Sequence, residues 1–289
     1  MATEPGSRLA VTPPRVPISL NPLFRRAILG ATGNRLVASG VRRYGMRLGA
    51  ARFVAGETLD ECVAVLRALN DEGLRTNTTL LGEGIREEAA VHANVATYRD
   101  VLDRIARERL TTNLAVKLTQ LGLDLTEDFA FQSVEALVTH AAALGNFVRI
   151  DMEDSPRVDA TLRIYRRLRA EGHDNVGTVL QSYLYRTEAD LVALLPLRPN
   201  LRLVKGAYLE PTSVAYAKKV DVDAAYLRLA ERMLAEAGCT AIATHDERII
   251  AHVIDLAERS GLGRDRFEFQ MLYGIRPDLQ RALVRRGYR

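Results

Sequence analysis

Two cations and a glycine interrupt an apolar run at residues 201–208, which read LRLVKGAY. A buried, unpaired cation costs several kcal/mol, so Arg202 and Lys205 need an anionic or hydrogen-bonding partner. Gly206 has no side chain, so a flat or phosphate-bearing ligand could approach its backbone closely. Cations and a glycine near the C-terminal end of a strand are typical of ligand sites in α/β proteins. We therefore expect this segment to be a strand that ends in a binding site.

Polar or ionisable residues also stand near the ends of the other apolar runs. They are Lys117, Asp151, Glu153, Gln181, Thr244, His245, Gln270 and Tyr273. In an α/β barrel, the carboxyl ends of the strands converge on one mouth, where active sites lie. Six successive strands that each contribute such a group predict an active site at that mouth.

Single members of this set also have structural explanations. Asp151 and Lys117 could form a buried ion pair. Asp246, directly after His245, could cap the next helix. Gln181 could satisfy backbone groups at a strand end. The set as a whole still favours a functional site, because a structural account needs a separate explanation for each strand.

The elements that must position these residues alternate between strand and helix. Strands are predicted at residues 77–81, 114–118, 147–152, 177–183, 201–207, 241–244 and 267–272. Amphipathic helices are predicted at residues 87–110, 125–143, 160–170, 188–195, 223–237, 247–259 and 277–285. This alternation predicts an α/β fold with a parallel sheet covered by helices. No Rossmann phosphate-binding glycine motif is present, and an α/β barrel needs eight strands, one more than we find.

The N-terminal part is expected to differ from the rest. Residues 1–22 are rich in proline and predict a flexible arm, and residues 23–73 predict helices, with the barrel at 74–289. A helical pattern covers residues 22–52, and a clear amphipathic helix follows at 59–69. Thr58 and Glu61 have the spacing of a capping box for that helix.

Composition excludes several classes of protein. The 289 residues are 47% hydrophobic with a formal charge of only +4, which favours a cored globular chain over a nucleic-acid-binding surface. No apolar run is long enough to span a membrane, and no secretory signal is evident. Cys62 and Cys239 do not make a disulfide framework, so a cytoplasmic location is expected.

The predicted mouth limits the possible chemistry. Asp151, Glu153 and His245 could hold a divalent metal, but no further ligands support them, and we predict no metal site. Lys205 could form a Schiff base, as in a class I aldolase. A non-enzymatic basic binding module is a further alternative. The excess of cations instead suits a polyanionic cofactor and a carboxylate substrate.

Four segments narrow this choice: FVRIDME at residues 147–153, LRLVKGAY at 201–208, ATH at 243–245 and FEFQ at 267–270. Together they resemble proline dehydrogenase, in its monofunctional bacterial form, and the resemblance runs from about residue 53 onward. The family implies a distorted (βα)8 barrel with non-covalent FAD. It oxidises L-proline to Δ1-pyrroline-5-carboxylate by hydride transfer from C5 of proline to N5 of the flavin, and passes the electrons to a membrane quinone.

The resemblance also assigns roles to single residues. Arg202 would approach flavin N5, and Asp151 would lie beside the substrate amine. Lys117 would pair with the proline carboxylate. The proline pocket would be walled by Tyr208 and Leu272. The cofactor would be lined by Met152, Gln181, Arg202, Lys205, Gly206, Ala207, Thr244 and His245.

Three further questions stay open. A different flavin barrel, of the methylenetetrahydrofolate reductase type, would share the fold. Peripheral contact with the inner face of the membrane and a homo-oligomeric state are both compatible with the resemblance, and no nucleic acid is expected as a partner.

The family pattern also continues beyond what we find. It implies an eighth strand and a final helix across the mouth, whose Tyr-x-x-Arg-Arg-x-x-Glu motif clamps the substrate carboxylate. Arg285 and Arg286 belong to the preceding predicted helix and do not match that pair, so we expect both last elements to be absent from these residues. Loss of two charge-assisted hydrogen bonds would weaken binding by roughly 3–6 kcal/mol. We therefore expect this chain alone to bind proline poorly while it keeps some FAD.

Overall fold

A computed structural model describes residues 53–289 of the chain. The predicted arm at residues 1–22 and the helical pattern at 22–52 lie outside the described residues. The helix predicted at 59–69 is confirmed as α3 (Leu59–Asp71). Its capping box is also confirmed, because Thr58 and Glu61 each accept a hydrogen bond from the other's backbone N–H. These two bonds satisfy amide groups that the first turn of a helix leaves free.

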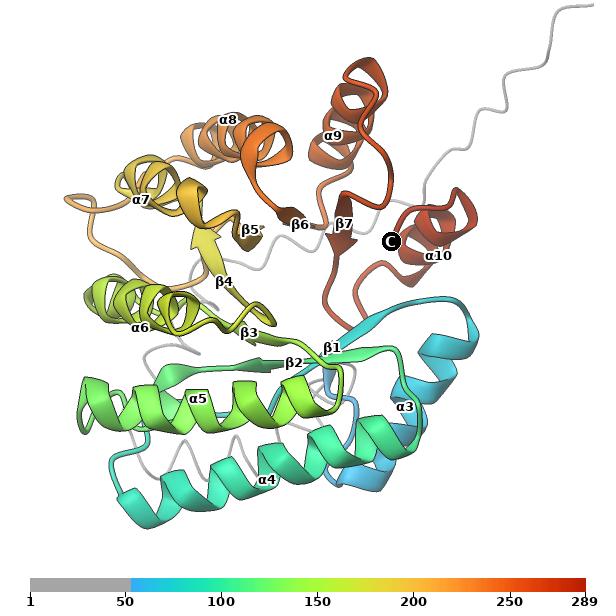
Figure 1. Cartoon of the computed structure of the whole chain (residues 1–289). Coiled ribbons are helices and arrows are strands. Elements are labelled where there is room, and N and C mark those ends of the chain that lie inside the picture. Colours follow the sequence, from blue (N-terminus) through green and yellow to red (C-terminus); the bar gives the residue numbers. More distant parts are fainter. Residues whose placement is uncertain (1–52) are drawn as a thin grey trace, which may run out of the picture. The chain divides into compact units, whose positions relative to one another are not determined.

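Seven strands form one sheet in the sequential order β1 to β7, and every neighbouring pair is parallel (Figure 1). Their bounds are β1 Thr76–Thr78, β2 Thr112–Val116, β3 Val148–Ile150, β4 Val176–Gln181, β5 Asn200–Val204, β6 Cys239–Ala243 and β7 Phe267–Gln270. The parallel α/β fold predicted from the sequence is therefore confirmed. The strands β1 and β7 form the two edges of this sheet.

A helix follows each strand, as the amphipathic patterns predicted. The bounds are α4 Glu88–Arg107, α5 Glu127–Ala143, α6 Val158–Ala170, α7 Thr187–Leu194, α8 Lys219–Glu236, α9 Glu247–Arg259 and α10 Pro277–Arg285. Short 3₁₀ turns occur at Leu118–Gln120, Ser155–Arg157 and Leu195–Leu197. After α10 the chain returns to the sheet edge, where the Phe269 N–H donates to the Arg289 carbonyl over 2.8 Å. Among the helices of residues 53–289, none combines the length and the apolar character needed to cross a bilayer.

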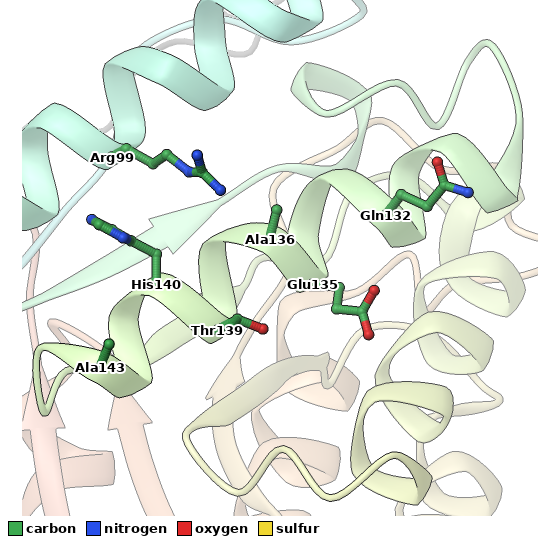
Figure 2. Close-up of a pocket in the computed structure, with 7 residues that line it drawn as sticks. All are labelled: Arg99, Gln132, Glu135, Ala136, Thr139, His140 and Ala143. Atoms are coloured by element: carbon green, nitrogen blue, oxygen red, sulfur yellow. The ribbon is translucent and has the colours of Figure 1, made fainter.

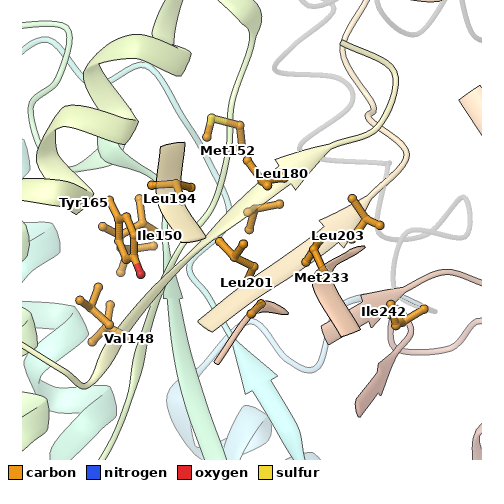
Figure 3. Packing of buried hydrophobic residues seen from close by; sticks show 14 of the residues in the cluster. Val148, Ile150, Met152, Tyr165, Leu180, Leu194, Leu201, Leu203, Met233 and Ile242 are labelled. Atoms are coloured by element: carbon orange, nitrogen blue, oxygen red, sulfur yellow. The ribbon is translucent and has the colours of Figure 1, made fainter. Parts of the chain in front are cut away.

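The two faces of the sheet differ in chemistry because successive strand residues point to opposite sides. The outer face packs against the helices and is apolar. Leu201 and Leu203 of β5, for example, are fully buried in the core (Figure 3). Between them, Arg202 points to the inner face, where the polar residues gather. This alternation places the candidate site inside the curve of the sheet, at the carboxyl ends of its strands.

Candidate active site

Arg202 is a cation of the mouth with two side-chain partners. Its Nη1 donates to Asp151 Oδ1 over 2.7 Å, and its Nη2 donates to Asn77 Oδ1 over 3.1 Å. Asn77 lies in β1 and Asp151 directly follows β3, so two distant parts of the chain fix this guanidinium of β5. The third donor, Nε, is buried and finds no acceptor among residues 53–289. Because a buried N–H without a partner is costly, this atom is a candidate donor to a ligand.

Lys205 lies just beyond β5 and is held by two carboxylates. Its Nζ lies 2.6 Å from Asp223 Oδ1 and 3.1 Å from Asp246 Oδ2. Asp223 belongs to the first turns of α8, and Asp246 is the N-cap of α9. Lys219 completes the group by pairing with Asp223 and, at 3.6 Å, with Asp246. Burial raises the pKa of both carboxyls, but hydrogen bonds led by Lys205 outweigh it, so both pKa values end below normal.

Lys117 differs from these two cations. It follows β2, is half-buried, and its Nζ has no hydrogen bond or ion pair within the described part of the chain. Asp151, the partner considered for it in the sequence, pairs with Arg202 instead. Lys117 therefore presents an ammonium group that an incoming anion can reach.

Gln181 and Glu153 tie neighbouring strand ends together. Gln181 Nε2 donates to the Glu153 carbonyl over 2.7 Å, so its structural role is real. The Glu153 carboxylate accepts from the backbone and the hydroxyl of Thr119. Burial raises the pKa of Glu153, against the effect of these two hydrogen bonds. Met152 stands between Asp151 and Glu153 in the sequence and is buried in the apolar cluster (Figure 3).

The segment after β6 connects to the segment after β7. The Leu272 N–H donates to His245 Nε2 over 2.9 Å, which makes that nitrogen an unprotonated acceptor. Burial and the neighbouring Arg276 lower the pKa of His245, in agreement with a neutral ring. Thr244 is buried, and its hydroxyl accepts from the Asp246 N–H. The cap predicted for the next helix is confirmed, since Asp246 accepts from the Arg248 N–H at the start of α9.

The loop after β5 carries the remaining predicted residues. Tyr208 donates to Glu83 Oε2 over 3.1 Å, and burial, then Glu83, raises its pKa. Gly206 has φ +113°, and a Cβ there would lie 2.3 Å from the ring of Tyr183. Glycine is thus required by the backbone conformation and by Tyr183. Ala207, after β5, and Leu272, after β7, are both exposed.

Two other features of residues 53–289 lie outside this mouth. The three residues considered for a metal, Asp151, Glu153 and His245, do not form a cluster of ligand atoms. The cluster that does form is Glu135, Glu171 and His173, on the helical surface. A hollow of about 370 Å³ lies there too, between Arg99 of α4 and one side of α5 (Figure 2). None of the predicted site residues lines it.

The donors at the mouth fit a flavin and a carboxylate substrate. Arg202 Nε is a buried donor with no acceptor among residues 53–289, which suits an acceptor atom such as a ring nitrogen. Lys117 is a cation without a side-chain partner in the same residues, which suits a carboxylate. Cations near the reacting ring also favour electron-rich reduced states. The residues present therefore fit the expected group.

Sequence reasoning missed three partners that position these cations: Asn77, Asp223 and Asp246. Asn77 was placed in a strand but given no role, and Asp246 was considered only as a cap. The sequence does indicate that such partners must exist, because a cation in a buried apolar strand requires an anionic or hydrogen-bonding partner. Nothing in the sequence indicates which of the many acidic residues folds against it.

The fold and the site define an α/β-barrel enzyme with a cationic mouth. The profile of the family described as "Proline dehydrogenase" matches residues 62–289. The chain is 41% identical over 274 residues to "Proline dehydrogenase" of Deinococcus radiodurans, covering 93% of this chain and 88% of that protein. It is 39% identical over 267 residues to "Proline dehydrogenase 1" of Bacillus subtilis, covering 92% and 88%. The chain belongs to the proline dehydrogenase family and is of its monofunctional bacterial type.

Solved structures show the same fold. The crystal structure of proline utilization A from Bdellovibrio bacteriovorus, inactivated by N-propargylglycine, superposes with a TM-score of 0.78 at 22% identity. The match covers 93% of this chain but only 32% of that longer protein. At this identity the likeness establishes the barrel domain and no more.

Proposed function

We propose that the chain oxidises L-proline to Δ1-pyrroline-5-carboxylate with non-covalently bound FAD. When bound, FAD supplies the hydride acceptor, its N5 atom, and passes the electrons on to a membrane quinone. The observation that carries the proposal is the buried Arg202 Nε, a fixed donor without an acceptor at the mouth of a proline dehydrogenase barrel.

Arg202 would act by pointing this donor at flavin N5. Asp151 and Asn77 hold the other two nitrogens of the guanidinium, so the direction of Nε–H is set before the cofactor arrives. A preorganised donor stabilises developing negative charge without reorganising during the reaction. Asp151 would also lie beside the substrate amine, where its charge orders the polar network.

Substrate binding would rest on Lys117. Its ammonium has no partner within residues 53–289 and would pair with the proline carboxylate. A charge-assisted bond of this kind fixes one end of the small substrate, which helps to hold its C5 in place. Tyr208 and the exposed Leu272 would wall the pocket.

Other mouth residues would hold the cofactor. The residues that would line the flavin are Met152, Gln181, Lys205, Gly206, Ala207, Thr244 and His245. Lys205 would reach the flavin from a position fixed by Asp223 and Asp246. Both carboxylates pair with the Lys205 ammonium and stabilise its charged form, whereas Schiff-base formation needs a neutral amine. This arrangement does not favour the aldolase alternative.

We place the catalytic unit in the barrel at residues 74–289. A quinone acceptor requires access to a membrane, so the protein would work at the cytoplasmic face of that membrane.

The test uses the purified protein loaded with FAD under anaerobic conditions. Addition of L-proline should bleach the flavin absorbance near its visible maximum. Pyrrolidine is the matched control, because it has the same ring without the carboxylate that Lys117 would bind, and it should reduce the flavin far more slowly. A protein that takes up no FAD would contradict the proposal. Bleaching by NADH but not by proline would favour the methylenetetrahydrofolate reductase type.

A further inference from the structure

A second arginine lies inside the sheet, below the candidate site. Arg149 of β3 is only 3% exposed. Its Nη1 donates to the carbonyls of Thr178 (3.2 Å) and Asn200 (3.0 Å), and its Nη2 donates to Asn200 Oδ1 over 2.7 Å. Its guanidinium carbon lies 5.0 Å from the centre of the Phe147 ring. Within residues 53–289 it forms no ion pair, so neutral oxygens and an aromatic ring alone hold the charge.

The neighbouring strand leaves room for this guanidinium. Gly177 of β4 pairs with Arg149 in register. A Cβ at Gly177 would lie 2.5 Å from the Asn200 carbonyl oxygen and 2.7 Å from both Arg149 Nη1 and Phe147 Cζ. All three contacts are too short for any side chain larger than hydrogen. The socket of Arg149, made of Phe147, Gly177, Thr178 and Asn200, is therefore shaped around a charged group.

Such a buried charge is expensive to keep. Burial, and then repulsion from Arg202, lower the pKa of Arg149 to about 10. This value is still well above neutral pH, so the guanidinium stays charged in the folded protein. A buried charge is costly to desolvate, so its presence is weak evidence for a stabilising role. Stability alone therefore does not explain the charge.

The position of Arg149 relates it to the site. Arg149 lies in β3 and Asp151 directly follows it, two residues further along the chain. Asp151 forms an ion pair with Arg202, which projects from the inner face of β5. On the opposite side, Arg202 is in register with Ala241, and Ala241 with Glu268 of β7.

Glu268 is half-buried, and Gln270 donates to its carboxylate. Its charge raises the pKa of Arg149, against the effect of burial. Within residues 53–289, this inner face carries the cations Arg149 and Arg202 and the carboxylates Asp151 and Glu268, and the Arg289 guanidinium also interacts with Cys239 there. Lys117, Lys205 and its two aspartates lie nearer the mouth.

We propose that Arg149 and Glu268, on the inner face of the sheet, set the reduction potential of the flavin with opposite signs. This inference rests on the proposed function. Two-electron reduction adds negative charge to a flavin, and a nearby cation favours the reduced state. Loss of the Arg149 charge makes the inner face less positive, which disfavours reduction. Without the charge of Glu268, the balance shifts the other way.

The experiment measures the midpoint potential of the bound flavin by anaerobic titration against a reference dye. Arg149→Met should lower the equilibrium constant for reduction about tenfold, which corresponds to about 30 mV for a two-electron couple. Glu268→Gln should raise it by a similar factor. Arg149→Lys keeps the charge and should stay close to the unmodified protein.

The variants separate the possible outcomes. If Arg149→Met does not fold, the opposite shift of Glu268→Gln and the unchanged potential of Arg149→Lys carry the test. Unchanged potentials in Glu268→Gln and Arg149→Met, or shifts of the same sign, would overturn the inference while leaving the proposed function intact. An unmodified protein that binds no FAD would refute the proposed function itself.

Discussion

The two faces of the sheet have opposite chemistry although they share every strand. On β5, Leu201 and Leu203 face the helices and are fully buried in the apolar core. Arg202, between them, faces inward and binds Asp151 and Asn77. The outer face is held by burial, at about 25 cal/mol per Å² of apolar surface. The inner face is held by directional contacts between charged and polar groups.

This difference shows which face of the sheet contains groups whose burial is unfavourable. Burying Arg149 and Arg202 is unfavourable in itself, and the outer face supplies the stability that keeps them in place. Substitutions on the outer face should therefore change the free energy of unfolding. Substitutions on the inner face should change the chemistry.

The largest effect is expected at Arg202. Arg202→Met removes the donor that we propose points at flavin N5, so it should slow flavin reduction by proline on the order of 100-fold or more. Stopped-flow absorbance measures this rate at saturating proline. Arg228→Met, on the exposed side of α8, is the matched control and should react at the normal rate. A normal rate in Arg202→Met would remove its proposed role.

The outer face should respond in the free energy of unfolding. Leu203→Ala removes a fully buried side chain and leaves a cavity, so it should destabilise the fold by about 2–5 kcal/mol. Urea denaturation followed by circular dichroism measures the loss. A loss below about 1 kcal/mol would show that the helix-facing side contributes less than its burial indicates.

A smaller effect on the inner side is expected at Lys117. Lys117→Ala removes the proposed charge-assisted contact with the proline carboxylate, worth about 1.5–3 kcal/mol, so proline should bind about ten- to a hundredfold more weakly. The proline concentration that half-saturates flavin reduction measures this change. The exposed Lys218→Ala is the control. If both variants bind proline equally well, the carboxylate contact lies elsewhere.

The smallest effect is expected away from both faces of the sheet. Thr126 caps α5 by accepting from the Phe129 N–H. Thr126→Ala should cost about 1 kcal/mol of stability and leave flavin reduction unchanged. Thermal unfolding measures the loss of stability, and stopped-flow absorbance measures the rate of flavin reduction. A slower reduction would show that this outer helix affects the chemistry.

The strands were predictable from the sequence because each is an apolar run, but their ends were not. Residues 147–152 were expected as a strand, and only Val148–Ile150 pair as one. Met152 stays buried beyond the paired segment. Apolar character reports burial, whereas strand bounds depend on hydrogen bonds to a neighbour. The helix bounds at Glu247–Arg259 and Pro277–Arg285 agreed with prediction, because caps and proline mark them locally.

The site was predictable as a set of residues and not as a set of contacts. Arg202 and Lys205 stood out because a cation in an apolar run needs a partner. Their partners Asp151 and Asp223 lie 51 and 18 positions away in the sequence, and only the fold brings them together. The same reasoning applies to Arg149, which also interrupts an apolar run: the sequence indicates that it needs partners, but not that Thr178 and Asn200 provide them.

On β5, Arg202 serves the chemistry of the inner face, whereas its neighbour Leu203 serves the stability of the outer face. The most direct test is the rate of flavin reduction by proline, per molecule of folded, FAD-loaded protein, in Arg202→Met and in Leu203→Ala. The account predicts a rate reduced on the order of 100-fold in Arg202→Met and a normal rate in Leu203→Ala. Equal rates in the two variants, whether both slow or both normal, would contradict it.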